Sequence, residues 1–167
     1  MSKFIIEKTV NASIEKTFQV FSNYEMFPKI ISRYYPSVIV RSRRGDVAVV
    51  AEHLRLLDKE FIIMAKHSVK QPNLHETVVV GGDIKGSYIN EQFFAVPEGT
   101  KLKIEAELKR SLFGFIINPQ PIIIGTIMNQ FRLFIGSFNI KNANSITKNG
   151  DNLVNIEAFA NKRLSIE

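Results

Sequence analysis

The chain has 167 residues, 45% hydrophobic and 23% charged, which is typical of a globular domain and excludes a disordered chain. It contains no cysteine, which excludes disulfides and thiolate metal sites. The formal net charge is +6, and its basic residues are spread along the chain apart from a cluster at 41–46, RSRRGD. This distribution indicates a generally basic surface. Residues 1–10 alternate and carry charge, unlike a signal peptide, so we expect one cytoplasmic domain spanning 1–167.

The first predicted elements are a strand and two short helices. The segment 3–10, KFIIEKTV, alternates as a strand does. In the following NASIEKTFQVFSN, Ser13 is a candidate N-cap, and the apolar residues after it recur at helical spacing. A second short helix is predicted over 24–33, with Pro28 in its first turn, where the missing backbone N–H does no harm.

Six further strands are predicted between residues 37 and 110. Turn signals separate them, namely RRGD (43–46), LDKE (57–60), QPNL (71–74), GGD (81–83) and PEGT (97–100). Strands at this spacing, with no helix between them, form an antiparallel meander.

Residues 111–131 contain no charged side chain, which raises the question of a membrane span. The polar residues and prolines at 118–121 divide this run into pieces shorter than the ~20 residues that a span requires. The pattern therefore predicts a loop and then a long buried helix that begins near Pro121. Its inner stripe would consist of Ile124, Ile127, Met128, Phe131, Phe134 and Phe138. From Asn142 onward the sequence leaves open whether the helix continues, a short helix follows, or the chain frays.

This order of elements, with VFSNYEMFPKI at 20–30 and GSYINEQFFAVPEGTKLKIEAEL at 86–108, resembles the START-like, helix-grip (SRPBCC) superfamily. Its polyketide cyclase/dehydrase and coenzyme-Q-binding branch is the most similar in look. The resemblance implies an α+β fold in which a curled seven-stranded antiparallel sheet wraps around a long C-terminal helix, with two short helices between strands 1 and 2. It also implies an apolar ligand cavity between sheet and helix. The tryptophan often found in the sixth strand of that branch is absent.

Hairpin geometry predicts which side chains face the cavity. In 101–109 the apolar residues alternate with charged ones, so the even-numbered residues must face inward. Paired residues share a face, so the assignment can be carried back from hairpin to hairpin. The predicted inward residues are the odd-numbered ones in 89–95, the even-numbered ones in 74–80, the odd-numbered ones in 61–69 and the even-numbered ones in 48–56. Because this would expose Val38 and Val40, a bulge or a longer loop is expected near RRGD.

The predicted inner face carries one chemically distinctive group. Glu52, His67, Glu76 and Glu91 would lie as diagonal neighbours across four adjacent strands. A histidine among carboxylates in a low-dielectric cavity could act as a general acid or base, or hydrogen-bond the polar head group of a ligand. Two structural alternatives stay open: a slipped register would move some of these residues to the solvent face, or they lie inward at a hydrated mouth.

Other chemical motifs are not apparent. His53, His67 and His75 lack the spacing of metal ligands, and their predicted faces disagree, so no metal site is expected. The segment GGDIKG at 81–86 is a hairpin turn in this interpretation and not a phosphate-binding loop.

The sequence thus predicts binding of a hydrophobic small molecule (a lipid, an isoprenoid quinone or a polyketide-like compound) by a carrier or chaperone without a cofactor. The predicted ligand-contacting residues are Phe27, Ile31, Glu52, Leu54, Ile63, Ala65, His67, Glu76, Val78, Ile89, Glu91, Phe93, Ile104, Ala106, Ile124, Ile127, Met128 and Phe131.

Two alternative functions remain open. One is a cyclase/dehydratase-type enzyme that uses His67 with Glu76 or Glu91 for proton transfer. The other is a factor that binds RNA or the ribosome through a basic face including Arg41, Arg43 and Arg44. Transient contact with a membrane surface and the oligomeric state are also left open.

Overall fold

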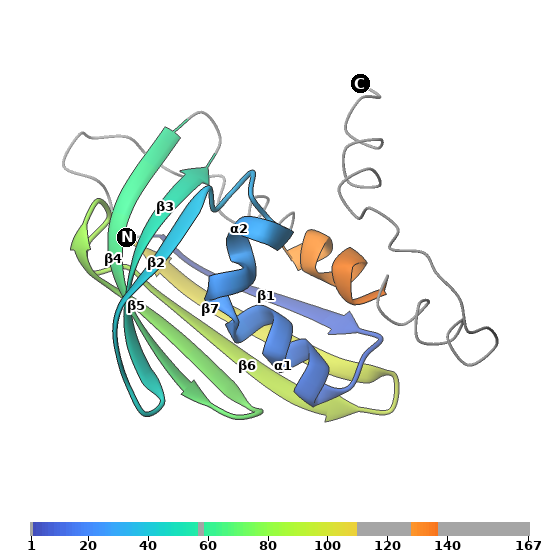
Figure 1. Cartoon of the computed structure of the whole chain (residues 1–167). Coiled ribbons are helices and arrows are strands. Elements are labelled where there is room, and N and C mark those ends of the chain that lie inside the picture. The colour runs from blue at the N-terminus through green and yellow to red at the C-terminus, as the bar shows by residue number, and fades with distance from the viewer. Residues whose placement is uncertain (1, 57–58, 110–127, 137–167) are drawn as a thin grey trace, which may run out of the picture.

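The computed structural model describes residues 2–56, 59–109 and 128–136. Its α+β architecture is a seven-stranded antiparallel sheet that curls around helical segments on its concave side (Figure 1). The strand order is β1-β7-β6-β5-β4-β3-β2, so every strand of the meander pairs with its neighbour in sequence and β1 closes against β7. This confirms the predicted helix-grip fold.

The elements follow the predicted order. They are β1 (Ser2–Val10), α1 (Ile14–Ser22), the 3₁₀ helix η1 (Tyr24–Met26), α2 (Phe27–Ile30), β2 (Ser37–Arg44), β3 (Val47–Leu56), β4 (Lys59–Lys70), β5 (Leu74–Gly82), β6 (Tyr88–Val96) and β7 (Gly99–Leu108). Residues 128–136 are helical and belong to the predicted C-terminal helix. The remainder of that predicted helix, with Ile124, Ile127 and Phe138, and the tail from Asn142 lie outside the described residues.

The two short helices meet at a corner. Ser13 caps α1 by accepting a hydrogen bond from the backbone N–H of Lys16 at 3.3 Å. The predicted second helix is shorter than expected, because it consists of the single turn η1 followed by α2. Pro28 lies in the first turn of α2, as predicted, where no intrahelical hydrogen bond needs its N–H.

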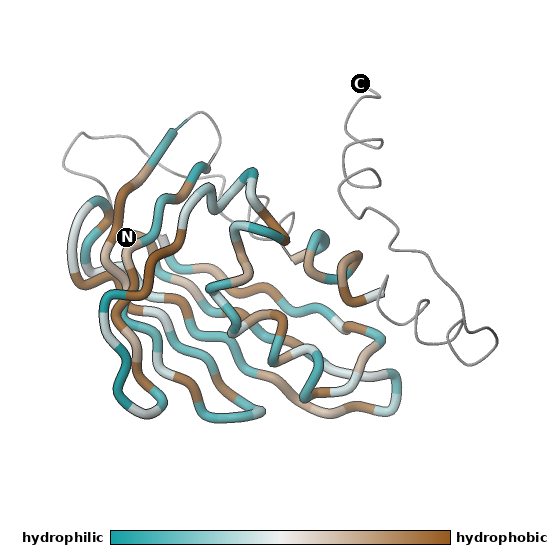
Figure 2. The backbone as a smooth tube through the Cα atoms, in the orientation of Figure 1, coloured by the Kyte–Doolittle hydropathy of each residue, from teal (hydrophilic) through white to brown (hydrophobic). Residues whose placement is uncertain are grey.

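Most of the predicted inner face is confirmed. Along β4 the odd-numbered residues 61–67 are buried, and in β3 the even-numbered residues 48–54 are buried, as predicted. Figure 2 shows hydrophobic and hydrophilic positions interspersed along the strands of the sheet. In β6 and β7 the predicted faces are also correct, and Phe93 pairs with Leu102 on the inner face. A register shift between Val40 and Ser42 supplies the expected bulge in β2.

The prediction for β5 was wrong by one residue. The predicted faces require even-numbered residues of β5 to pair with odd-numbered residues of β6, whereas Val78 pairs with Tyr88. A shift of one residue inverts the face of the whole strand, because side chains alternate with a period of two. Toward β4, Lys70 pairs with Leu74 across a loop of three residues, and this second shift leaves the predicted face of β4 correct. His75, Thr77 and Val79 therefore face inward, and Glu76 and Val78 lie on the outer face of the sheet.

The apolar core of the concave side has two parts. The larger part joins α1, η1 and α2 to the sheet and to the helical segment 128–136, with Phe131 lying 4.5 Å from Phe21 and 5.4 Å from Phe27 between ring centroids. The smaller part consists of Leu54, Phe61, Ile63, Ala65, Val79 and Ile84. Tyr34 and Tyr35 pack against both parts.

Gly99 allows β7 to pass close to the end of β1. Its φ is +131°, and a Cβ at this position would collide with the backbone carbonyl oxygen of Val10.

We expect Gly99→Ala to lower the free energy of unfolding by about 2 kcal/mol, measured by urea denaturation. The control is Gly45→Ala, because Gly45 also has a positive φ, +54°, but a Cβ there would meet open space. Its expected cost is about 1 kcal/mol, from backbone strain alone. Equal costs at the two positions would contradict the steric explanation.

No helix within the described ranges is both long enough and apolar enough to cross a membrane.

Candidate functional site

Four side chains form a continuous hydrogen-bonded chain across the inner face of the sheet, which we call the polar chain. It consists of Glu52 on β3, His67 on β4, His75 on β5 and Glu91 on β6. Oε1 of Glu52 lies 2.8 Å from Nε2 of His67, and Nδ1 of His67 lies 2.9 Å from Nε2 of His75. Nδ1 of His75 lies 2.6 Å from Oε2 of Glu91. Each of the four strands contributes one residue, so the polar chain forms only when these strands are paired.

The polar chain is buried. The side chains of Glu52, His67 and His75 are 2–3% exposed, and that of Glu91 is 14% exposed. On the sheet these residues lie among the residues of the two apolar core clusters. A buried carboxylate without a partner is strongly unfavourable, so the hydrogen bonds are what allow the charges to stay here.

Both ring nitrogens of each histidine are used within the polar chain. The His67 and His75 rings are nearly parallel, with centroids 5.2 Å apart and an interplanar angle of 15°. Each of the three hydrogen bonds needs one proton, and two neutral imidazoles supply only two. When all three hydrogen bonds are filled, the two carboxylates contribute −2 and the one extra proton contributes +1. The polar chain then has a net charge of −1. This sum does not depend on which atoms hold the protons.

Three further side chains surround the polar chain. The Thr77 hydroxyl lies 3.2 Å from Nδ1 of His67, and the Tyr24 ring lies over the His67 ring with centroids 4.3 Å apart. Burial raises the pKa of the Tyr35 hydroxyl well above its ordinary value, and the negative charges of Glu52 and Glu91 raise it further. The Tyr35 hydroxyl therefore stays neutral.

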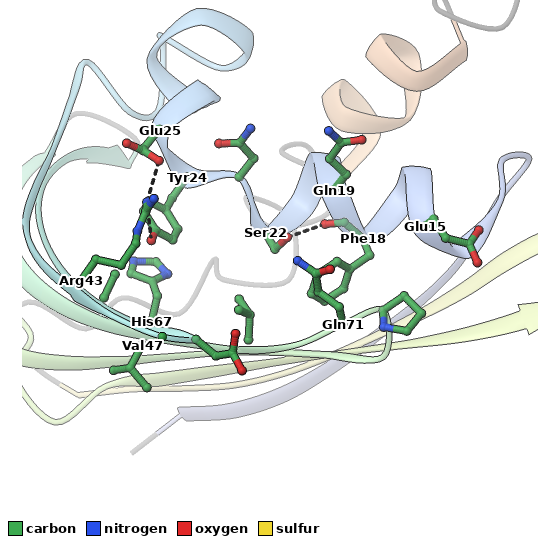
Figure 3. A pocket seen from close by; sticks show the side chains of 16 residues that line it. Glu15, Phe18, Gln19, Ser22, Tyr24, Glu25, Arg43, Val47, His67 and Gln71 are labelled. Carbon is green, nitrogen blue, oxygen red and sulfur yellow. Dashed lines mark hydrogen bonds and ion pairs between the residues drawn. The ribbon is translucent and has the colours of Figure 1, made fainter.

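A pocket of about 730 Å³ opens beside His67. Its walls come from α1 and η1 on one side and from the β2–β3 hairpin and the start of the β4–β5 loop on the other (Figure 3). Phe18, Ala48 and Val69 supply apolar surface. At its edge Arg43 donates hydrogen bonds to the Tyr24 hydroxyl at 3.2 Å and to Glu25 at 2.6 Å. The volume is within the range of small-molecule sites.

This pocket differs in place from the expected cavity between the sheet and the C-terminal helix. Of the predicted ligand-contacting residues that the structure describes, His67 alone lines it. Ten others are buried in the apolar core or beside it: Phe27, Ile31, Leu54, Ile63, Ala65, Phe93, Ile104, Ala106, Met128 and Phe131. Ile89 and Glu91 face inward and are half-buried. Whether any of these residues contacts a ligand stays a prediction.

One of the four polar residues predicted for the inner face, Glu76, was wrong. Glu76 is not part of the polar chain, because its side chain lies on the outer face and accepts a hydrogen bond from Asn90 at 3.3 Å. His75 takes the place that was assigned to Glu76. The sequence signal that could have revealed this is a loop of three residues, Gln71–Asn73, which would have placed His75 opposite Val69 on the inner face.

Within the described part of the chain, no group of three or more histidine, aspartate or glutamate side chains is arranged to hold a metal ion.

Comparisons with known proteins place the fold. No family model matches the sequence, and no curated protein matches it. Solved structures do match. Major latex-like protein 151 from Panax ginseng aligns with a TM-score of 0.67 at 10% identity, over 80% of this chain and 96% of its own. A START superfamily protein from Mycobacterium smegmatis aligns with a TM-score of 0.63 at 12% identity, over 85% and 97%.

A third match is the Zhui aromatase/cyclase from Streptomyces sp. R1128. It aligns with a TM-score of 0.61 at 9% identity, over 81% of this chain and 93% of its own. At these identities the alignments establish the fold alone. The chain therefore has the helix-grip fold of START-like proteins, and the resemblance noted in the sequence is confirmed at that level.

Proposed function

We propose that this protein binds a hydrophobic small molecule that also carries a polar group, as a carrier or chaperone does. The candidates are those named from the sequence: a lipid, an isoprenoid quinone or a polyketide-like compound. The observation that carries the proposal is the polar chain beside a pocket. A hydrogen-bonded row of Glu and His side chains within an apolar concave surface is costly to bury, and orienting the polar group of a ligand is a reason to keep it there.

The fold supports the same proposal. START superfamily and aromatase/cyclase structures share the concave sheet, which gives one side of a domain a surface that can enclose an apolar body. Burial of such a body contributes about 25 cal/mol per Å² of apolar surface removed from water.

The enzyme alternative has less support than the sequence indicated. Glu76 is on the outer face, and both nitrogens of His67 are engaged by Glu52 and His75. His67 therefore has no free nitrogen with which to take a proton from a substrate. The alternative of RNA binding needs Arg41, Arg43 and Arg44 on one free basic face, but Arg43 is paired with Glu25.

Native mass spectrometry of the freshly purified protein tests the binding proposal. We expect a bound species of defined mass that organic extraction releases as an apolar compound. A protein that is free of ligand as isolated, and that also fails to take up lipid, quinone or polyketide-like compounds added to it, would contradict the proposal.

A further inference from the structure

The charge around the pocket has the opposite sign to that of the whole chain. The formal net charge of +6 would by itself favour anionic ligands. We propose instead that the site selects a neutral or cationic ligand whose polar group donates hydrogen bonds, such as an alcohol, a phenol or an ammonium group, and discriminates against carboxylates. This inference rests on the proposed function and names the chemical class of its ligand.

The first observation is the charge of the polar chain. Its two carboxylates, with one extra proton when all three hydrogen bonds are filled, give it a net charge of −1 in a buried place. The bonds use one oxygen of each glutamate, Oε1 of Glu52 and Oε2 of Glu91, and all four histidine nitrogens. Of the polar chain, His67 is the member that lines the pocket, and both of its nitrogens are already hydrogen-bonded. The polar chain therefore acts on a ligand through its negative charge, which repels an anionic group and does not repel a neutral or cationic one.

The second observation is independent, because it concerns the edge of the pocket. Among residues 2–56, 59–109 and 128–136, Glu15, Glu25 and Asp46 line the pocket together with one cation, Arg43, and no lysine. Arg43 is already bound to Glu25 at 2.6 Å, so this pair is close to neutral. Glu15 and Asp46 are left as negative charges, whose carboxylate oxygens accept hydrogen bonds from a donating ligand group. Phe18, Ala48 and Val69 add apolar surface to the same pocket.

The buried charge outweighs the exposed ones. Glu15 and Asp46 are exposed and screened by salt, and so are the basic residues that produce the net charge of +6. The polar chain is shielded from solvent, so its field is screened less. Between two like unit charges about 8 Å apart, with an effective dielectric constant of about 20, repulsion corresponds to roughly a thirtyfold loss of affinity. Allowing for partial screening, we expect discrimination of about tenfold or more.

Three probes with the same ring system test this inference. They are 2-naphthalenemethanol, 2-naphthylmethylamine and 2-naphthoic acid, which at pH 7 carry a neutral, a positive and a negative group on one apolar body. Dissociation constants are measured by isothermal titration calorimetry or by NMR titration. We expect the alcohol and the amine to bind, and the acid to bind at least about tenfold more weakly than the alcohol.

A variant with Glu52→Gln and Glu91→Gln tests the cause. Two glutamines and two neutral histidines can fill all three hydrogen bonds with no net charge. In this variant the ratio of acid to alcohol affinity should rise toward one. The control is Glu76→Gln, which removes a nearby carboxylate from the outer face and should leave the ratio unchanged. Circular dichroism shows whether the double variant is folded. If the double variant is not folded, the dissociation constants of the acid and the alcohol for the wild type are compared at low salt and at 0.5 M salt. Discrimination by a buried charge should persist at 0.5 M salt.

The outcomes separate the two proposals. If the acid binds as tightly as the alcohol, or if discrimination disappears at 0.5 M salt, the buried charge does not select the ligand and this inference is wrong, whereas the binding function stands. If none of the three probes binds at millimolar concentration and extraction yields no ligand, the proposed binding function is wrong and the inference is wrong with it.

Discussion

Replacing His75 with leucine is expected to lower the free energy of unfolding by about 3–5 kcal/mol, which is typical of breaking a buried ionic pair from one side. His75 bridges His67 and Glu91, at 2.9 Å and 2.6 Å. Leucine can bridge neither, so the Glu91 carboxylate loses the partner that compensates its burial. The measurement is urea denaturation of the wild type and the variant at pH 7.

The matched control is Glu76→Gln on the same strand. Glu76 is the next residue after His75, but it faces outward and makes one side-chain hydrogen bond, with Asn90. Its replacement should change the free energy of unfolding by no more than about 0.5 kcal/mol. A loss below about 1 kcal/mol for His75→Leu would mean that the polar chain is not a coupled buried network. A double-mutant cycle with His67→Leu then measures the coupling between the two histidines.

Phe93→Ala should be equally severe for a different reason. Phe93 is fully buried, and its ring makes edge contacts with Phe18 at 5.2 Å and with Phe21 at 6.1 Å between centroids. Truncation removes the contacts that hold α1 on the sheet and leaves a cavity. We expect a loss of about 3–5 kcal/mol in the free energy of unfolding, measured by denaturant or thermal unfolding.

Phe94→Ala is the control for this truncation. Phe94 follows Phe93 on β6, points to the opposite face and is 47% exposed. The same change of side chain should therefore alter the free energy of unfolding by no more than about 0.5–1 kcal/mol. If the two variants were equally destabilised, the assignment of the inner and outer faces of β6 would be wrong.

The sequence by itself determined the order of elements, the antiparallel meander and the inner faces of β3, β4, β6 and β7. The reason is local and physical. Charged and apolar residues alternate so regularly in 101–109 that only one face can be buried. Ser13 and Pro28 likewise act within one helical turn, so their places in the helices could be predicted from the neighbouring residues in the sequence.

The tertiary structure decided the face of β5 and, with it, the composition of the candidate site. Leu74–Gly82 contains polar and apolar residues on both faces, so its alternation does not choose between them. The choice was made by the registers of its two pairings, in which Lys70 pairs with Leu74 and Val78 pairs with Tyr88, and a shift of one residue exchanges Glu76 for His75 on the inner face. The polar chain depends on side chains from four strands meeting within hydrogen-bond distance, which is a property of the paired sheet and of no single segment of sequence.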